Sequence, residues 1–288
     1  MALDIKHLAS NPTLAGQAEV FPDIQYSKNG QSLSLIVPWS VNQDRESISP
    51  RPLIVFVQGS AWTTPDLNFQ LPMLAKYAEM GYIVATVSHR SYQDGHKMPA
   101  FLIDVKCAIR FLRAKAEDFH IDPERVMIYG TSSGGNTALL VALTPNDQRY
   151  KSQEYAEQSD AVLAVVECFA PTDCMRIFDA WMSVEEKNEL LKLVIGEDEK
   201  IWEETLISLS PARIVNAENS KIPFLLLNGT VDEVVPVEHM ELMYDALIAE
   251  NADVIAYYVD GAVHENNFWS PEVREAIKEW ILEKFPLD

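Results

Sequence analysis

The residues Tyr129–Gly135 place a serine in a turn that few folds can accommodate. A β-branched and apolar run leads directly into this turn and a helical pattern follows it, so a strand must meet a helix within a few residues. Glycines flank Ser132 at two residues before and two after, and they leave room for a sharp, strained turn that lifts the hydroxyl clear of a sheet. Ser133 lacks this spacing. The pattern is typical of a nucleophile elbow, and it also occurs in ordinary turns and phosphate-binding helix starts.

Strands and helices alternate along the rest of the chain. The pattern favours a mostly parallel sheet of about eight strands with right-handed crossovers and helices on both faces. Asn29-Gly30 marks a hairpin between the first two strands. The predicted strands are Ile24–Tyr26, Ser32–Val37, Pro52–Val57, Tyr82–Val87, Val126–Tyr129, Ala161–Val166, Pro223–Leu227 and Val254–Val259, and the main helices are Leu71–Glu79, Pro99–Glu117, Asn136–Leu143, Pro236–Ala249 and one that starts at Ser270-Pro271.

Length and composition fit a single α/β domain over residues 1–288, with 48% hydrophobic residues to fill its core. Residues 1–18 are expected to form an N-terminal arm, and the acidic helical stretch 174–209 to form an insertion that caps the sheet.

The net charge of −20 disfavours nucleic acid and anionic membrane surfaces as partners. The sequence shows no secretory signal and no apolar run of bilayer-spanning length, which predicts a cytoplasmic protein. Three cysteines do not suggest a disulfide framework.

Polar residues follow several of the predicted strands at their carboxyl ends, where open parallel sheets form their ligand sites. Ser132, Asp232 and His264 each lie just after a strand and are therefore expected at one edge of the sheet. A serine hydroxyl needs a base to remove its proton, and an imidazole can take that proton and later donate it to the leaving group. A carboxylate would hold the imidazole in the required tautomer. We predict these three residues as the catalytic set.

An oxyanion would need preorganised N–H donors beside the serine. The backbone N–H groups of Ser60, Ala61 and Ser133 are the predicted donors, since the first two follow the strand Pro52–Val57 and the third follows Ser132. Gln58 and Trp62, in the same loop, are predicted to contact substrate, with packing on the sheet edge as the alternative for Trp62.

Other residues compete for the same roles. His89 and His96 are rivals for the base, but both precede the elbow in the chain. Asp173 and Glu233 are rivals for the acid, and Asp232 is preferred because it follows the strand after the insertion. His120 and His239 are expected to be surface or capping residues. Arg90 and Asp104 are expected to form a structural pair, and Cys107 to be buried and inert.

From about Pro52 onward the chain resembles the α/β-hydrolase superfamily, and within it the small esterases of the hormone-sensitive-lipase and acetyl xylan or feruloyl esterase type. The resemblance depends on Gln58-Gly59-Ser60-Ala61-Trp62, on Gly130-Thr131-Ser132-Ser133-Gly134-Gly135, on Asp232 within Gly229–Pro236, and on His264, in the order serine, acid, histidine. One departure is that Gln58 replaces the histidine that usually opens the family's oxyanion loop, and Ser60 and Ala61 replace glycines.

The resemblance implies an α/β-hydrolase fold and a serine carboxylesterase that needs no metal or organic cofactor. We expect it to act on a small-molecule ester, of a short-chain or carbohydrate-linked type such as acetyl or feruloyl esters, through an acyl-serine intermediate. The bulkier oxyanion loop favours small acyl groups. Two alternatives remain open at this stage: an amidase, peptidase or formamidase-like hydrolase with the same three residues, and a non-catalytic binding protein on the same scaffold.

Overall fold

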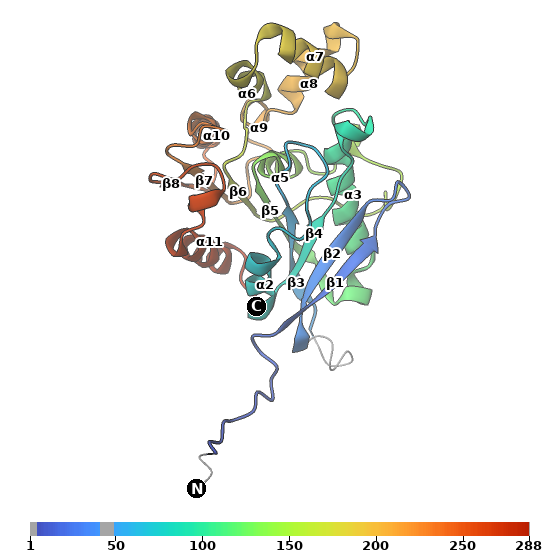
Figure 1. Cartoon of the computed structure of the whole chain (residues 1–288). Helices are drawn as coiled ribbons and strands as arrows, with labels where there is room; N and C mark the ends of the chain where they lie inside the picture. Colours follow the sequence, from blue (N-terminus) through green and yellow to red (C-terminus); the bar gives the residue numbers. More distant parts are fainter. Residues whose placement is uncertain (1–4, 41–48, 288) are drawn as a thin grey trace.

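The computed structural model describes residues 5–40 and 49–287, and within them the strands form one eight-stranded sheet (Figure 1). The strand order is β1-β2-β4-β3-β5-β6-β7-β8. The first two pairings, β1 with β2 and β2 with β4, are antiparallel, and all the others are parallel. The strands are β1 (Ala18–Gln25), β2 (Ser32–Pro38), β3 (Arg51–Val57), β4 (Ile83–Val87), β5 (Ile121–Thr131), β6 (Val165–Cys168), β7 (Phe224–Gly229) and β8 (Val254–Val259).

Helices cover both faces of this sheet, as the alternating pattern predicts, and each face has its own hydrophobic core. One core includes side chains of α2 (Leu71–Met80) and α11 (Pro271–Lys284). The other includes side chains of α3 (Ala100–Ala114), α5 (Ser133–Leu143) and α10 (Glu238–Ala249). Further helical segments are α4 (Ala116–Phe119), α6 (Cys174–Trp181), α7 (Val184–Val194), α8 (Trp202–Ser208), α9 (Pro211–Ile214) and the short 3-10 turns Tyr92–Asp94, Gln148–Tyr150, Glu199–Ile201 and Asn266–Phe268.

Two helix boundaries illustrate how local sequence sets these elements. Helix α2 ends at Gly81, whose φ of 126° is a conformation that glycine adopts without strain. Helix α11 begins with Pro271 in its first turn, and the Ser270 side chain accepts a hydrogen bond from the Val273 N–H. Both boundaries agree with the sequence prediction.

Three strands differ from their predicted ranges by more than two residues. Strand β5 begins at Ile121, whereas Val126 was the predicted start. Strand β1 begins at Ala18, so the described part of the N-terminal segment pairs with the sheet earlier than the hairpin pattern indicates. Strand β6 is Val165–Cys168, whereas Ala161–Val166 was predicted. The predicted range ends before Glu167, and this residue is fully buried in β6, where a charged side chain is rarely found.

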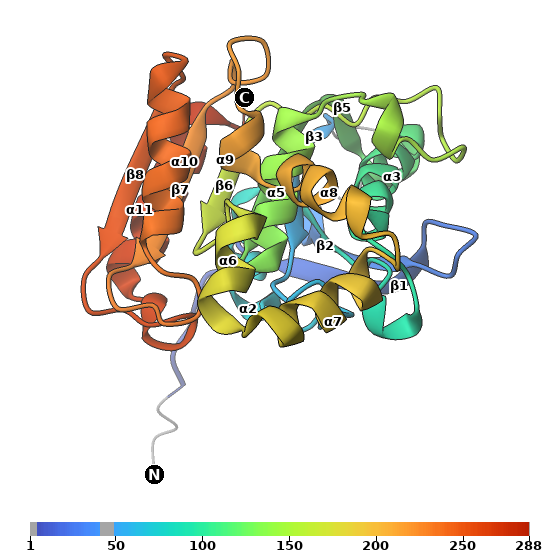
Figure 2. The ribbon, with the colours of Figure 1, turned by 90° about the horizontal axis from the view of Figure 1, so that it is seen from above.

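The helices α6, α7 and α8 form a layer of their own beyond the carboxyl ends of the strands, between β6 and β7 in the chain (Figures 1 and 2). Viewed from above, this layer lies over α5 and α3 (Figure 2). It is tied to the segment before α3 by a backbone hydrogen bond from the Met98 N–H to the Val194 carbonyl at 2.7 Å. These helices lie within residues 174–209, the stretch predicted to be helical from the sequence.

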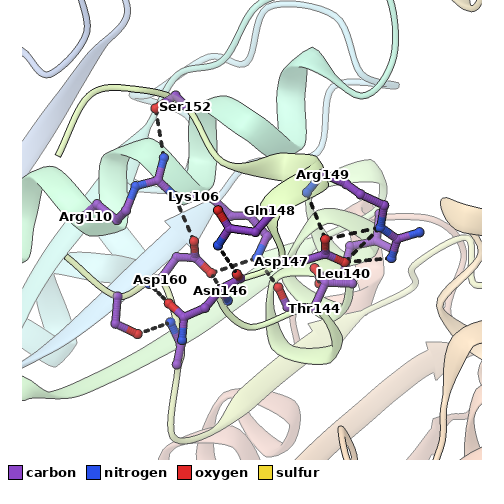
Figure 3. Close-up of polar contacts among 12 residues, drawn as sticks. Lys106, Arg110, Leu140, Thr144, Asn146, Asp147, Gln148, Arg149, Ser152 and Asp160 are labelled. Carbon is purple, nitrogen blue, oxygen red and sulfur yellow. Dashed lines mark hydrogen bonds and ion pairs between the residues drawn. The ribbon is translucent and has the colours of Figure 1, made fainter. Parts of the chain in front are cut away.

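A buried ionic network joins α3 to the loop that follows α5 (Figure 3). Asp160 accepts from Lys106 Nζ and from Arg110 Nη1, each at 2.8 Å, and all three side chains are almost completely buried. The backbone N–H of Asn146 donates to the same carboxylate at 2.8 Å. One carboxylate thus compensates two buried cations, and both cations lie on α3. Arg90 and Asp104 also form the expected pair at 2.8 Å.

Candidate active site

Ser132 lies in a strained turn between β5 and α5, as the elbow pattern predicts. Its φ of 51° and ψ of −127° are unfavourable for a residue with a side chain. The turn is possible because neighbouring backbones approach very closely: a Cβ at Gly130 would lie 2.1 Å from the Gly134 carbonyl oxygen, and one at Gly134 would lie 2.1 Å from the Val57 carbonyl oxygen. Glycine is therefore required at both positions, and the elbow is held directly against β3.

The three predicted side chains come together in a single hydrogen-bonded chain. His264 Nε2 is 3.0 Å from Ser132 Oγ, and His264 Nδ1 is 2.8 Å from Asp232 Oδ2. The three residues are up to 132 positions apart in sequence, and they meet because β5, β7 and β8 are parallel and end at the same edge. The arrangement gives the hydroxyl a base and gives the base a carboxylate partner.

Two further contacts fix the acid and the base. The other oxygen of the Asp232 carboxylate, Oδ1, accepts the backbone N–H groups of Val234 and Val235 at 2.8 Å each. The His264 ring packs edge-on against Phe169, with ring centroids 4.7 Å apart. The carboxylate and the imidazole therefore hold their orientation without help from a substrate.

The three predicted oxyanion donors differ in whether their N–H groups already donate a hydrogen bond within the protein. The Ser60 N–H already donates to Ser133 Oγ at 2.9 Å, so this donor is occupied in the structure. Within residues 5–40 and 49–287 no hydrogen bond uses the N–H of Ala61. The N–H of Ser133 lies in the first turn of α5, where a helix supplies no acceptor. Ala61 and Ser133 are thus the available donors beside Ser132, and Ser60 holds the two loops together.

A cavity of about 370 Å³ opens at Ser132 and His264. Gln58 lines it, as predicted, together with the oxyanion loop. Trp62 is not among the lining residues: its indole is 5% exposed and packs between Phe101 of α3 and Phe178 of α6. The loop turns at Ala61 and Trp62, both with positive φ, and this directs the indole into the core beneath the helical layer. The packing alternative for Trp62 therefore describes its position. The full lining is Gln58, Gly59, Ser60, Ala61, Asp66, Phe69, Ser132, Val234, His264 and Glu265.

Glu265 is a site residue that the sequence reasoning missed. It follows His264 directly, lines the same cavity and has a φ of 58° and ψ of −125°. Burial raises the pKa of its carboxyl, while hydrogen bonds from Trp269 and Gln58 and the charge of His264 oppose that rise. Its backbone conformation, which suits glycine, cannot be read from the sequence, and its position directly after His264 was the available signal.

The rival residues have structural partners. His89 is buried and its Nδ1 lies 3.1 Å from the Arg90 carbonyl oxygen, and burial lowers its pKa. Asp173 caps α6 by accepting from Met175 N–H and binds Arg213 at 2.8 Å. His239 was expected at the surface or as a capping residue, and the surface position is wrong because the side chain is buried. Its Nδ1 accepts from the backbone N–H of Thr172 at 3.2 Å, close to the start of α6.

The described residues contain neither a cluster of metal-ligating side chains nor a membrane-spanning helix. Within residues 5–40 and 49–287 there is no group of three or more His, Cys, Asp or Glu side chains placed to hold a metal ion. In the same ranges no helix is long and apolar enough to cross a bilayer. The three cysteines are buried and unpaired, and burial raises the pKa of Cys107.

The chain is similar to several proteins that are named as esterases. A family model described as BD-FAE matches residues 41–247. The probable carboxylic ester hydrolase LipM and the esterase LipC, both from Mycobacterium tuberculosis, are 28% and 29% identical over 82% and 75% of this chain. The match spans about half of each relative, 53% of its length. A solved structure, a truncated carbohydrate esterase from gut microbiota, superposes with a TM-score of 0.76 and 22% identity, covering 92% of this chain and 96% of the other. The fold is that of the α/β-hydrolases.

Proposed function

Because this chain belongs to the BD-FAE family, we propose that it is a serine carboxylesterase that hydrolyses short-chain or carbohydrate-linked esters through an acyl-serine intermediate. The observation that carries the proposal is the hydrogen-bonded chain from Ser132 through His264 to Asp232, with distances of 3.0 and 2.8 Å. The esterase names of LipM and LipC agree with it. Neither a metal ion nor an organic cofactor takes part in this mechanism.

Each residue has a defined step in the reaction. His264 Nε2 removes the proton of Ser132 Oγ as that oxygen attacks the ester carbonyl, and Asp232 stabilises the imidazolium that forms. The N–H groups of Ala61 and Ser133 stabilise the oxyanion. His264 then donates its proton to the leaving alkoxide, which departs as the alcohol and leaves the acyl group on Ser132. A water molecule, deprotonated by the same imidazole, then attacks the acyl-serine. The imidazolium returns this proton to Ser132 Oγ as the acyl–oxygen bond breaks and the acid is released.

The cavity supports a preference for small acyl groups. Its volume is about 370 Å³, near the lower limit of small-molecule sites, and Phe69 and Val234 supply its larger apolar side chains. The layer α6–α8 packs on Trp62 through Phe178, so it supports the oxyanion loop from behind. We propose that this cap segment sets access for the alcohol part of the substrate, and that Gln58 contacts the substrate at the cavity wall.

The test compares Ser132→Ala with the wild-type protein on p-nitrophenyl acetate. The variant is expected to lose all hydrolysis above background while keeping the wild-type circular dichroism spectrum, because only the nucleophile is removed. A fluorophosphonate probe is expected to label the wild-type protein and not the variant. Equal turnover by the two proteins would refute the acyl-serine mechanism, and a wild-type protein that neither turns over nor reacts with the probe would be a non-catalytic scaffold.

The substrate class is tested with a chain-length series of p-nitrophenyl esters beside acetylated and feruloylated sugars. The small cavity predicts that kcat/KM falls as the acyl chain lengthens beyond a few carbons. Matched N-formyl and dipeptide amides belong in the same panel, since higher kcat/KM on an amide than on its matched ester would favour the amidase alternative.

A further inference from the structure

Two hydroxyl groups, one on either side of the nucleophile, accept hydrogen bonds from the oxyanion loop that follows β3. The Gly59 N–H donates to Thr131 Oγ1 at 3.0 Å, and the Ser60 N–H donates to Ser133 Oγ at 2.9 Å. Thr131 and Ser133 are the residues directly before and after Ser132, and both side chains are buried. Two consecutive residues of the loop are therefore tied to the two residues that flank the reacting hydroxyl.

The loop also lies directly against the nucleophile at Gly59. A Cβ added at this position would lie 2.7 Å from the Ser132 Cβ and 2.9 Å from the Thr131 carbonyl oxygen. An approach this close leaves the loop no room to move towards the elbow. The two hydrogen bonds oppose movement away from it, so the distance between the loop and Ser132 is fixed in both directions.

The loop turns sharply just beyond these two anchors. Ala61 and Trp62 have φ of 51° and 57°, in the left-handed region that residues with a side chain rarely occupy. The Ser60 carbonyl oxygen closes the turn, because it accepts from the Thr63 N–H at 3.0 Å and from the Thr63 hydroxyl at 2.6 Å. The Ala61 N–H is the next donor along the loop after the two that are engaged, and it is therefore the loop donor that remains for an oxyanion.

We propose that Thr131 and Ser133 are positioning residues: their hydroxyl oxygens set the register of the oxyanion loop against the elbow and so place the Ala61 N–H beside Ser132. The inference rests on the proposed function, since it concerns the same site. The contribution of the two hydroxyls is geometric, and placement errors of about 1 Å at a reacting centre lower rates on the order of a hundredfold. The backbone N–H of Ser133 remains a direct oxyanion donor, so the side chain and the main chain of this residue have separate roles.

The decisive variant is Thr131→Val, which keeps the shape of the side chain and removes the hydroxyl acceptor. We expect kcat on p-nitrophenyl acetate, per active site titrated with a fluorophosphonate, to fall about tenfold to a hundredfold and KM to stay within about twofold. Thr131→Ser retains the acceptor and is expected to keep kcat within about threefold of wild type. Thr144→Val is the matched control: its buried hydroxyl donates to the Leu140 carbonyl oxygen within α5, and wild-type kinetics are expected.

Inhibition by trifluoroacetone separates a positioning role from a purely structural one. Ser132 Oγ adds to the ketone carbonyl carbon, its proton passes to His264, and the carbonyl oxygen becomes an oxyanion that depends on the same N–H donors. For Thr131→Val the inhibition constant is expected to rise by the factor by which kcat/KM falls, about tenfold to a hundredfold. Ser133→Ala keeps its backbone N–H and loses only the hydroxyl, and a parallel change of about tenfold in both quantities is expected.

The positioning role would be overturned if Thr131→Val kept both kcat per active site and the inhibition constant of the wild-type protein. A loss in Thr131→Ser as large as in Thr131→Val would overturn it too, as would a fall confined to the fraction of titratable sites. If Thr131→Val does not fold, Ser133→Ala decides by the same two quantities. In all these outcomes the wild-type protein still hydrolyses the ester, whereas absence of hydrolysis by the wild-type protein would refute the proposed function itself.

Discussion

Glu167 gives the sharpest test of the core beneath the elbow. It is fully buried in β6, opposite Gly130 of β5. Its Oε2 accepts the Ala170 N–H at 3.0 Å, and its Oε1 has no hydrogen-bond partner within the described residues 5–40 and 49–287. Burial raises the pKa of the carboxyl from 4.5 to about 8. The perturbation is Glu167→Gln, which replaces the carboxyl with a neutral group of the same shape.

The sign of the effect follows from the raised pKa. Between pH 4.5 and about 8 the folded protein holds a proton that the unfolded chain has lost, so the free energy of unfolding falls as pH rises through this window. At about 1.4 kcal/mol per pKa unit, the full shift corresponds to a loss on the order of 5 kcal/mol above pH 8. Between pH 6 and pH 9 the loss is about 3 kcal/mol. Glutamine does not ionise, so the variant does not lose this unfolding free energy as pH rises.

The assay is urea unfolding followed by tryptophan fluorescence at pH 6, 7, 8 and 9. The difference in unfolding free energy between Glu167→Gln and wild type is expected to rise by about 3 kcal/mol in favour of the variant across this range. Taking the difference cancels the titration of every other group. Glu279→Gln is the exposed control, and its difference from wild type is expected to stay constant. A constant difference for Glu167→Gln as well would show that burial does not perturb this carboxyl, and would refute the reasoning.

Two further substitutions test the framework around the site. Asp160→Asn is expected to lower the free energy of unfolding by about 3–5 kcal/mol, because Lys106 and Arg110 would remain charged and buried without a counter-charge. The control Asp147→Asn breaks an exposed pair and is expected to lower it by under about 1 kcal/mol. Equal losses for the two variants in urea unfolding would contradict this. Gly134→Ala is expected to abolish fluorophosphonate labelling, since its Cβ would meet the Val57 carbonyl oxygen at 2.1 Å, and retained labelling would contradict the close approach.

The sequence was most informative where chemistry imposes a local pattern. The glycine spacing around Ser132 identified the elbow, because no other residue fits that turn. The order of serine, acid and histidine at the ends of parallel strands identified Asp232 and His264, since such strands end at one edge of the sheet. These predictions needed only short-range patterns and the topology of a parallel sheet.

The sequence was least informative where partners are distant in the chain. Nothing near Ser60 indicates that its N–H is taken by Ser133, and nothing near Trp62 indicates that it packs on Phe178. Glu167 and the network of Asp160 were missed because charged residues are normally read as exposed. Hydrophobic periodicity cannot show which buried charges have a partner or are neutralised.

The close approach of main chains at the elbow has a consequence for how this protein can be altered. Main-chain atoms set the spacing between β3, β5 and α5, and no side chain can be added at Gly130 or Gly134. Mutagenesis libraries that exclude these glycines can therefore vary the cavity wall at Asp66, Phe69 and Val234 widely, and change which molecules enter without moving the hydroxyl that reacts with them.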